Sequence, residues 1–387
     1  MTTASTLESR VRAHLRTLSE RGLLRTLRSP TGLDLSSNDY LALSRHPAVK
    51  ASMIAAVQRD GCGSTGSRLL GGHREAFNTV ERAFAAFKGT ERALYFSSGY
   101  LANLAVLTSF VEPGDVVLSD RLNHASLRDG IRLSLAKRVV FPHNDATALA
   151  RRIGGASGQA QVFVVTESLF SMDGDRSPLA TYADICRKTG ALLIVDEAHA
   201  VGIRGQSGSG LIEESGIGSD VLLSINSAGK ALGVAGAFVA GPAWAIEHLA
   251  QQARPFLFST APPPAVANAI QTSLTIVTNE PERRAQLRRR AAFLRERLSV
   301  AGISTPGGDT PIIPVVIDGN HRAVEVADAL QADGFDVRAV RPPTVPSGTA
   351  RLRISVHVDL SEVDLDRFAN RLATVLTGQV PCPVASS

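Results

Sequence analysis

The sequence predicts an α/β protein built on a mainly parallel, seven-stranded sheet with helices on both faces. From residue 93 onward, short apolar runs alternate with helical patterns or long connections. These runs lie at residues 93–96, 116–119, 138–141, 162–166, 192–196, 221–225 and 237–240. Such runs are typical of strands that are buried on both faces of a sheet. Because ligands bind at the carboxyl ends of parallel strands, we expect the functional residues there.

Composition limits the class of protein. The 387 residues are 44% hydrophobic and 20% charged, which indicates one large domain and at least one smaller one. Lys and Arg total 41 against 36 Asp and Glu, an excess too small and too dispersed to indicate nucleic-acid binding. The three cysteines form no C-x-x-C pair, so neither a disulfide framework nor a metal site is predicted. No long apolar run predicts a transmembrane helix, and we expect a cytoplasmic protein with no membrane partner.

Three regions lie outside the predicted sheet. Near the N-terminus, Leu7, Val11 and Leu15 recur at helical spacing, which favours a docking arm helix over an organellar transit peptide. A charged helix at 281–298 leads to a smaller α+β unit, in which Pro314 suggests an edge strand. That unit has predicted strands at 312–317 and 351–358 and a closing helix at 362–376. The predicted domains are an N-terminal helical arm (1–48), a large cofactor-binding domain (49–277) and a small C-terminal α+β domain (278–387).

Two motifs resemble nucleotide-binding signatures but lack the required context. The glycines of residues 61–66 match G-x-G-x-x-G, yet a helical pattern precedes them where a dinucleotide-binding turn needs a strand. The Asp-Glu-Ala-His run at 196–199 also occurs in nucleic-acid-dependent ATPases, which need a P-loop. Here Lys230 is followed by Ala231 instead of Ser or Thr, so the P-loop is missing. We interpret residues 61–66 as a flexible loop that exposes its backbone.

Three other features point together to one cofactor. Lys230 lies between small residues after an apolar run, Asp196 ends a buried strand, and residues 97–100 open an apolar helix. A lysine can form a Schiff base, a carboxylate can keep a pyridine nitrogen protonated, and a helix N-terminus can bind a phosphate. Pyridoxal phosphate (PLP) needs all three, and Tyr100 and His124 could supply flat faces for its ring. Each feature alone has a plainer explanation, such as a solvated lysine or an ordinary N-cap.

Seven segments then occur in the order seen in the α-oxoamine synthases, which are fold-type I PLP-dependent transferases. These segments are residues 37–41, 96–100, 123–126, 167–175, 196–199, 229–233 and 341–346. The chain resembles that family over most of its length. The resemblance implies a homodimer with active sites at the subunit interface. It also implies a decarboxylative condensation of an amino acid with an acyl-CoA or an acyl carrier protein (ACP) thioester.

The resemblance further implies a role for each matching residue. Lys230 would form the Schiff base and act as general base, Asp196 would contact the pyridinium nitrogen, and His124 would stack on the ring and contact substrate. His199, a further catalytic position, and Ser171 would contact the ring's polar substituents. The phosphate would be served by Ser98, Gly99, Tyr100 and Ser227, and substrate by Arg25, Asn38, Arg341, Thr344 and Arg353, with Arg353 on the amino-acid carboxylate.

Two positions depart from the family's pattern. Ser227 stands where these enzymes commonly have threonine, so the hydroxyl is retained with less rigidity. Ala42 replaces a frequent glycine, which matters only if the backbone there needs a positive φ angle.

The substrate pair is predicted from one segment. Residues 341–346 resemble the biotin-pathway member of the family, which implies L-alanine and a pimeloyl thioester on CoA or ACP. Two prolines after Arg341 would stiffen a loop that presents a cation to the distal carboxylate. The alternatives are glycine with acetyl- or succinyl-CoA, and serine with a long acyl-CoA. A rival from another class is a non-catalytic nucleotide-binding module built on Asp196, His199 and the glycine loop.

Overall fold

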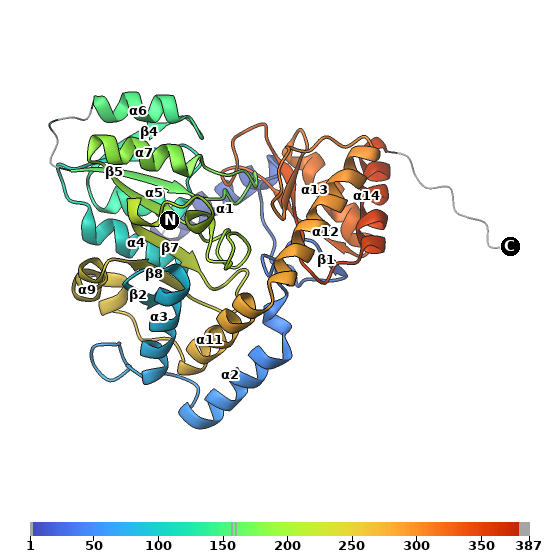
Figure 1. The fold of residues 1–387 in the computed structure, drawn as a ribbon. Coiled ribbons are helices and arrows are strands. Elements are labelled where there is room, and N and C mark those ends of the chain that lie inside the picture. The colour runs from blue at the N-terminus through green and yellow to red at the C-terminus, as the bar shows by residue number, and fades with distance from the viewer. Residues whose placement is uncertain (1–2, 156–157, 159–160, 379–387) are drawn as a thin grey trace. The chain divides into compact units, whose positions relative to one another are not determined.

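The structure, a computed structural model, describes residues 3–155, 158 and 161–378, whose elements are drawn in Figure 1. The chain divides into two compact units. Unit 1 comprises residues 1–37, 172–174 and 287–387, and unit 2 comprises residues 38–171 and 175–286. Among the described helices, none combines the length and the apolar character needed to cross a membrane.

Unit 2 contains the predicted seven-stranded sheet. Its spatial order is β2 (Arg92–Phe96), β8 (Ala237–Gly241), β7 (Val221–Ser227), β6 (Leu192–Asp196), β5 (Val162–Glu167), β3 (Val116–Asp120) and β4 (Lys137–Phe141). Strand β8 is antiparallel to both of its neighbours, and all other adjacent pairs are parallel. The prediction of a mainly parallel sheet is therefore confirmed.

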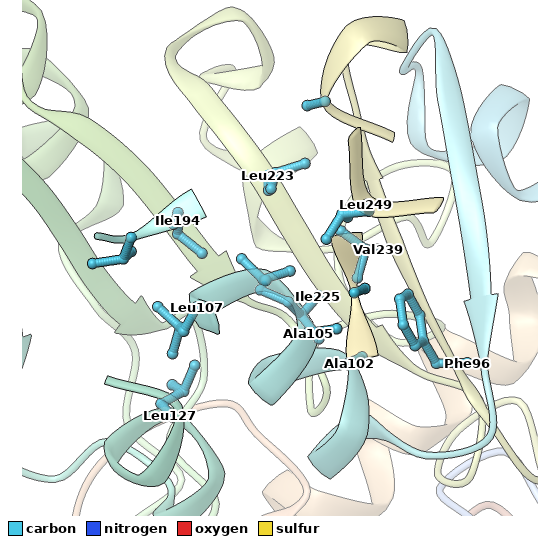
Figure 2. Close-up of a cluster of buried hydrophobic side chains, with 14 of the residues drawn as sticks. Phe96, Ala102, Ala105, Leu107, Leu127, Ile194, Leu223, Ile225, Val239 and Leu249 are labelled. Atoms are coloured by element: carbon cyan, nitrogen blue, oxygen red, sulfur yellow. The ribbon is translucent and has the colours of Figure 1, made fainter. Parts of the chain in front are cut away.

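Helices cover both faces of this sheet. On β8, Phe238 stacks on Phe84 of α3 (Glu75–Lys88) with ring centroids 4.1 Å apart. The next residue, Val239, points to the other face, because successive side chains of a strand alternate. There it joins a buried cluster with Ile225 and with Leu107 of α4 (Gly99–Phe110), as Figure 2 shows. The two faces of β8 are thus covered by different helices.

The remaining elements of unit 2 lie before, between or after these strands in the chain. They are η1 (Leu43–Arg45), α2 (Pro47–Asp60), α5 (Ala125–Leu133), α6 (Ala146–Gly154), α7 (Leu179–Thr189), α8 (Leu211–Glu214), η2 (Gly218–Asp220), α9 (Ala243–Gln252), α10 (Arg254–Leu257) and α11 (Pro264–Asn279). Helix α12 (Pro281–Val300) contains the point at which the chain passes from unit 2 to unit 1.

Unit 1 holds two small sheets and three further helices. Strand β12 (Arg351–Ser355) lies between β11 (Ala339–Val340) and β9 (Ile312–Val316), and both pairings are antiparallel. Pro314 therefore lies in an edge strand, as predicted, where its missing N–H costs no ladder hydrogen bond. Strand β1 (Leu33–Asp34) pairs with β10 (Phe335–Asp336), and the helices are α1 (Thr3–Glu20), α13 (Asn320–Ala332) and α14 (Glu362–Thr377).

The helical arm is present as α1, but its docking stays a prediction. Leu7, Val11 and Leu15 are 52%, 47% and 45% exposed, so these apolar side chains are about half covered at best.

The glycine loop is held more firmly than we expected. Ser64 Oγ donates to the carbonyl of Pro262 at 2.6 Å, and the N–H of Ala261 donates to the carbonyl of Gly66 at 2.9 Å. These bonds tie residues 64–66 to the segment before α11. Part of the loop is thus anchored, and its flexibility stays a prediction.

Candidate active site

The candidate active site lies at the carboxyl ends of three adjacent strands in unit 2. Strands β5, β6 and β7 end in Glu167, Asp196 and Ser227, and the register pairs Glu167 with Asp196. Because these strands are parallel neighbours, their ends meet at one edge of the sheet. Lys230 follows β7 directly, so it joins the same edge.

Lys230 begins a chain of hydrogen-bonded groups. Its Nζ lies 2.8 Å from Nε2 of His199, and Nδ1 of His199 lies 2.7 Å from the hydroxyl of Tyr40. That hydroxyl donates to Oδ1 of Asn38 at 3.2 Å. If Tyr40 donates to Asn38, it accepts from Nδ1–H of His199, and Nε2 is then free to accept from the lysine ammonium. His199 and Tyr40 thus orient the lysine nitrogen.

The short helix η1, with Ala42 at its N-terminal turn, packs directly against the lysine loop. A Cβ atom on Gly233, which has φ +67°, would lie 2.3 Å from the backbone nitrogen of Ser44. This close approach requires glycine at the end of the Lys230 segment. Ala42 in the same turn has φ 53°, a left-handed conformation that strains alanine. The glycine that the family commonly has at this position would adopt it without strain. The departure at Ala42 therefore does matter to the backbone.

Asp196 is oriented by two donors. Its Oδ2 accepts from Nδ2 of Asn103 at 2.7 Å, and its Oδ1 accepts from the N–H of Ala198 at 2.9 Å. Asp196 is 5% exposed and Asn103 is 2% exposed. The carboxylate is thus buried, hydrogen-bonded and fixed in direction, as a partner for a ring nitrogen has to be.

Glu197, the next residue of the Asp-Glu-Ala-His run, has a structural role. It forms a buried ion pair with Lys88, with Nζ and Oε2 2.5 Å apart, and its Oε1 accepts from the N–H groups of Leu211 and Ile212. Within the residues that the structure describes, no group of three or more His, Cys, Asp or Glu could hold a metal ion. The run therefore supplies one acid to the site and one to the framework.

Glu167 is an acid of the site that sequence reasoning missed. Burial, followed by the charge of Asp196, raises its pKa to about 8, although Lys230 and backbone donors from His124 and Ser171 oppose the shift. The N–H of His124 donates to its Oε1 at 2.6 Å. The available signal was an acidic residue at the carboxyl end of a buried strand, the same signal that identified Asp196.

The predicted phosphate region also comes together. Ser98 caps α4, with its hydroxyl accepting from the N–H of Leu101 at 3.3 Å. A Cβ atom on Gly99 would lie 4.0 Å from Cβ of Ser227, so the N-terminus of α4 and the end of β7 are adjacent. Backbone N–H groups at a helix N-terminus beside a hydroxyl suit a phosphate. Tyr100 is 43% exposed, and its hydroxyl donates to Asp129 at 2.6 Å.

His124 caps α5 beside these groups. Its ring opens to the surface, but the surrounding protein withdraws it from bulk water, which lowers its pKa; the charge of Asp196 raises the pKa and that of Lys230 lowers it. Asp196 and Lys230 thus act on both His124 and Glu167. The lysine amine and the oriented carboxylate both lie near the imidazole, the N-terminus of α4 lies beside Ser227, and these residues fit PLP.

The predicted substrate residues of unit 1 form their own groups. Arg353 is 7% exposed, and its guanidinium donates to Oγ of Ser355 at 2.6 Å. Arg351, on the same face of β12, forms an ion pair with Asp173, so it is committed to the framework. Leu352 and Ile354 are fully buried on the alternate face, as the pattern predicted. The structure places Arg353 within unit 1, and its approach to Lys230 stays a prediction.

The other predicted substrate residues of unit 1 lie around one loop. Arg25 donates to the carbonyl of Pro342 at 3.2 Å, and Arg341 donates to the carbonyl of Gly22 at 2.5 Å. The N–H of Thr344 donates to the carbonyl of Arg341 at 3.1 Å. Desolvation lowers the pKa of Arg341, and the nearby charge of Arg25 lowers it further. Two guanidinium groups are thus held close together.

Comparison with known families agrees with this geometry. Residues 30–372 match the model of the family described as aminotransferase class I and II. The chain belongs to the aminotransferase class I and II family. Its fold is the fold-type I architecture of PLP-dependent transferases, as the sequence predicted.

Known members define the relationship more closely. The chain is 42% identical to the 8-amino-7-oxononanoate synthase of Geobacter sulfurreducens over 94% of this chain and 97% of the relative. It is 44% identical to the enzyme of that name from a Mycobacterium species (strain KMS) over 92% and 93%. A solved serine palmitoyltransferase from S. paucimobilis, which has bound PLP, is 28% identical with a TM-score of 0.89 over 98% of this chain and 100% of that one. The predicted resemblance to the α-oxoamine synthases is confirmed, and the predicted cofactor agrees with the one in the solved relative.

Proposed function

We propose that this PLP-dependent acyltransferase condenses L-alanine with a pimeloyl thioester, on CoA or ACP, in biotin biosynthesis in the cytoplasm. The α-carbon of alanine would bond to the thioester carbonyl. The thiol and carbon dioxide would leave, and the product would be 8-amino-7-oxononanoate. The names of the similar curated enzymes support this choice.

The cofactor and the chain would divide the chemistry. PLP supplies an electron sink for the charge that develops at the α-carbon. Lys230 would remove the α-proton, and its hydrogen bond to His199 would aim the nitrogen. Asp196 would hold the proton of the ring nitrogen, and the N-terminus of α4 with Ser227 would bind the phosphate. Arg353 would grip the amino-acid carboxylate, which suits its planar fork.

Arg25 and Arg341 in unit 1 support the proposal of an acyl chain with a distal carboxylate. Desolvation and then the charge of Arg25 lower the pKa of Arg341, while Asp328 raises it, so the contact between the two arginines is unfavourable on electrostatic grounds. A distal carboxylate of the acyl chain would relieve that repulsion and would itself avoid an unpaired, desolvated state. The acetyl and palmitoyl chains of the alternative substrates carry no such group. The succinyl chain carries one on a shorter chain, so the amino acid and the chain length distinguish that alternative.

A homodimer is the second part of this proposal. Leu69, Leu70 and Phe258 of unit 2 are 54%, 89% and 73% exposed. The bridge between Ser67 and Thr260 brings their two segments side by side. Adjacent exposed apolar side chains are typical of an interaction surface, and the family implies a second copy as the partner. Sedimentation analysis should give twice the chain mass, and a monomer at micromolar concentration would contradict the proposal.

The test compares matched acyl chains. Alanine, glycine and serine should be assayed against pimeloyl, heptanoyl, succinyl, acetyl and palmitoyl thioesters, with release of free thiol and carbon dioxide as readouts. We expect alanine with pimeloyl to be preferred, and heptanoyl, which lacks only the distal carboxylate, to be about 10–100-fold poorer, the value of one or two charge-assisted hydrogen bonds. Preference for glycine or serine would assign another family activity, and a colourless protein that binds ATP would favour the nucleotide-binding alternative.

A variant links this preference to the arginines. Arg341→Gln should reduce the advantage of pimeloyl over heptanoyl and leave the KM for alanine unchanged. Arg322→Gln is the control, because Arg322 pairs with Glu325 on an exposed surface of the same unit. An undiminished preference for pimeloyl in Arg341→Gln would refute the role of this residue.

A further inference from the structure

A buried relay of hydrogen bonds connects Asp196 to His124. Nδ2 of Asn103 donates to Oδ2 of Asp196 at 2.7 Å and also to Oγ of Ser126 at 2.8 Å. Oγ of Ser126 lies 2.7 Å from Nδ1 of His124. Asn103 and Ser126 are 2% and 0% exposed, so water does not compete for these bonds.

The direction of each bond follows from the first one. A carboxylate only accepts, so the amide nitrogen of Asn103 must face Asp196, and its two N–H groups serve Asp196 and Ser126. The amide oxygen of Asn103 is buried and has no hydrogen-bond partner among the described residues. The opposite orientation of the amide would place this oxygen against the carboxylate. The relay therefore keeps its direction even though one buried acceptor is left unsatisfied.

The last bond determines the state of the imidazole. Oγ of Ser126 accepts from Asn103, so its own hydrogen is available to donate to Nδ1 of His124. The backbone N–H of Ser126 points to the same nitrogen at 3.3 Å. A hydroxyl can rotate and become an acceptor, but a backbone N–H cannot. A proton on Nδ1 would therefore oppose a fixed donor, whether the ring were neutral or cationic.

We propose that Asn103 and Ser126 are positioning residues that hold His124 as the neutral imidazole with its proton on Nε2, in register with the Asp196 carboxylate. His124 then offers one N–H donor and a neutral ring face to whatever binds beside it. Only the catalytic consequence of this inference rests on the proposed function, because the tautomer belongs to the protein itself.

The charges around His124 act on its protonation state in opposite directions, so the hydrogen bonds of the relay determine that state. Asp196 on β6 and Asp129 on α5 favour a cationic ring, whereas Lys230 after β7 and the desolvation of the ring disfavour it. Glu167 on β5 accepts from the backbone N–H of His124, so it fixes the position of the residue without contacting a ring nitrogen. The donors that face Nδ1 thus determine which of the two neutral tautomers or the cation His124 adopts.

The tautomer can be measured directly. Protein labelled with ¹⁵N-histidine should be studied by long-range ¹H–¹⁵N correlation between pH 5 and 9, with PLP bound and after its removal. The His124 signal is assigned by its loss in His124→Gln. We expect a protonated Nε2 and an unprotonated Nδ1 in both forms. A proton on Nδ1 at pH 7 in the wild-type protein would overturn the proposal whatever the enzyme turns over.

Two variants separate the relay from a merely structural role. Ser126→Ala removes the hydroxyl donor and keeps the backbone N–H, so it should increase the fraction of His124 that carries a proton on Nδ1, raise the pKa of His124 and move the acidic limb of kcat/KM to higher pH. Ser126→Thr retains the hydroxyl and should restore the wild-type pattern, with folding checked by thermal melting. An unchanged His124 spectrum in a folded Ser126→Ala protein would also overturn the proposal. Failure of turnover with alanine and pimeloyl thioester would affect only the proposed function.

Discussion

Replacing His143 with glutamine should remove a pH-dependent contribution to the stability of unit 2. The imidazole joins two acids: its Nδ1 lies 2.9 Å from Oδ1 of Asp120, and its Nε2 lies 2.7 Å from Oδ2 of Asp175. Both ring nitrogens can donate only when the ring is a cation. Burial alone would lower the pKa of His143, but the hydrogen bonds and charges of the two acids outweigh it and raise the pKa to about 9.

The magnitude follows from linkage. The difference between that pKa and the ordinary histidine value of about 6.5 corresponds to at most about 3 kcal/mol, and about 1–3 kcal/mol is expected after screening. The side chain of His143 is 17% exposed, so the loss by solvent screening is modest. Because the folded-state pKa is raised, this stability is fully present below about pH 6.5 and is lost as pH rises through about 9.

Urea denaturation at several pH values between 6 and 10 tests this reasoning. The wild-type free energy of unfolding should fall across that window more steeply than that of His143→Gln, and the two curves should converge at high pH. His248→Gln is the matched control, because His248 bonds to the carbonyl of Ser109 and lies against the ring of Phe110, and neither partner is an acid. Parallel curves for wild type and His143→Gln would refute the assignment of a cationic clamp.

Three further predictions concern named side chains. Lys230→Ala should lose covalent attachment of PLP on borohydride reduction and at least about 10²–10⁴-fold in turnover, whereas the exposed Lys50→Ala should lose neither; normal turnover in Lys230→Ala would exclude it as the base. Lys88→Met should cost about 3–5 kcal/mol of unfolding free energy by leaving Glu197 buried without its partner, against less than about 1 kcal/mol for Lys188→Met in an exposed pair; equal losses would contradict the burial argument. Ala42→Gly should change stability by about 0 to +1.6 kcal/mol, because relief of about 1–2 kcal/mol at φ 53° equals or exceeds the chain-entropy cost of about 0.4–1 kcal/mol; a loss like the ~1 kcal/mol expected for Ala51→Gly in α2 would contradict it.

The strands could be predicted because the signal for them is local. A buried parallel strand is a short, continuous apolar run, and β6 (Leu192–Asp196) begins and ends where the sequence predicted. The positions of Lys230, Asp196 and the N-terminus of α4 follow from the topology, since strand ends converge at one edge. No local sequence pattern indicates that β8 lies antiparallel between β2 and β7, because pairing direction depends on how distant strands meet.

The hydrogen-bond partners could not be predicted in the same way. Asn103 lies within an apolar helix and Ser126 within the first turn of another, and neither position has a local pattern that indicates a polar contact. Their role arises only when α4 and α5 pack together over β6. Tyr40 and His199 are likewise joined only by the tertiary structure, with the phenol and the imidazole 2.7 Å apart. Sequence reasoning thus identified the groups that carry charge more readily than the neutral groups that orient them.

The Asp-Glu-Ala-His run shows why a motif alone could not assign these roles. Asp196 and Glu197 are adjacent acids at the end of β6, and successive side chains of an extended chain point in opposite directions. Asp196 therefore meets Asn103 at the site, whereas Glu197 meets Lys88 from the last turn of α3 and the N–H groups that begin α8. The ion pair of Glu197 with Lys88 and the hydrogen bond of Asp196 with Asn103 therefore depend on the same stretch of backbone. A change at Lys88 should consequently disturb the direction of Asp196 as well as the stability of unit 2. A change at the buried Asn103 should act on Asp196 directly and also cost stability, because it leaves buried polar groups without a donor.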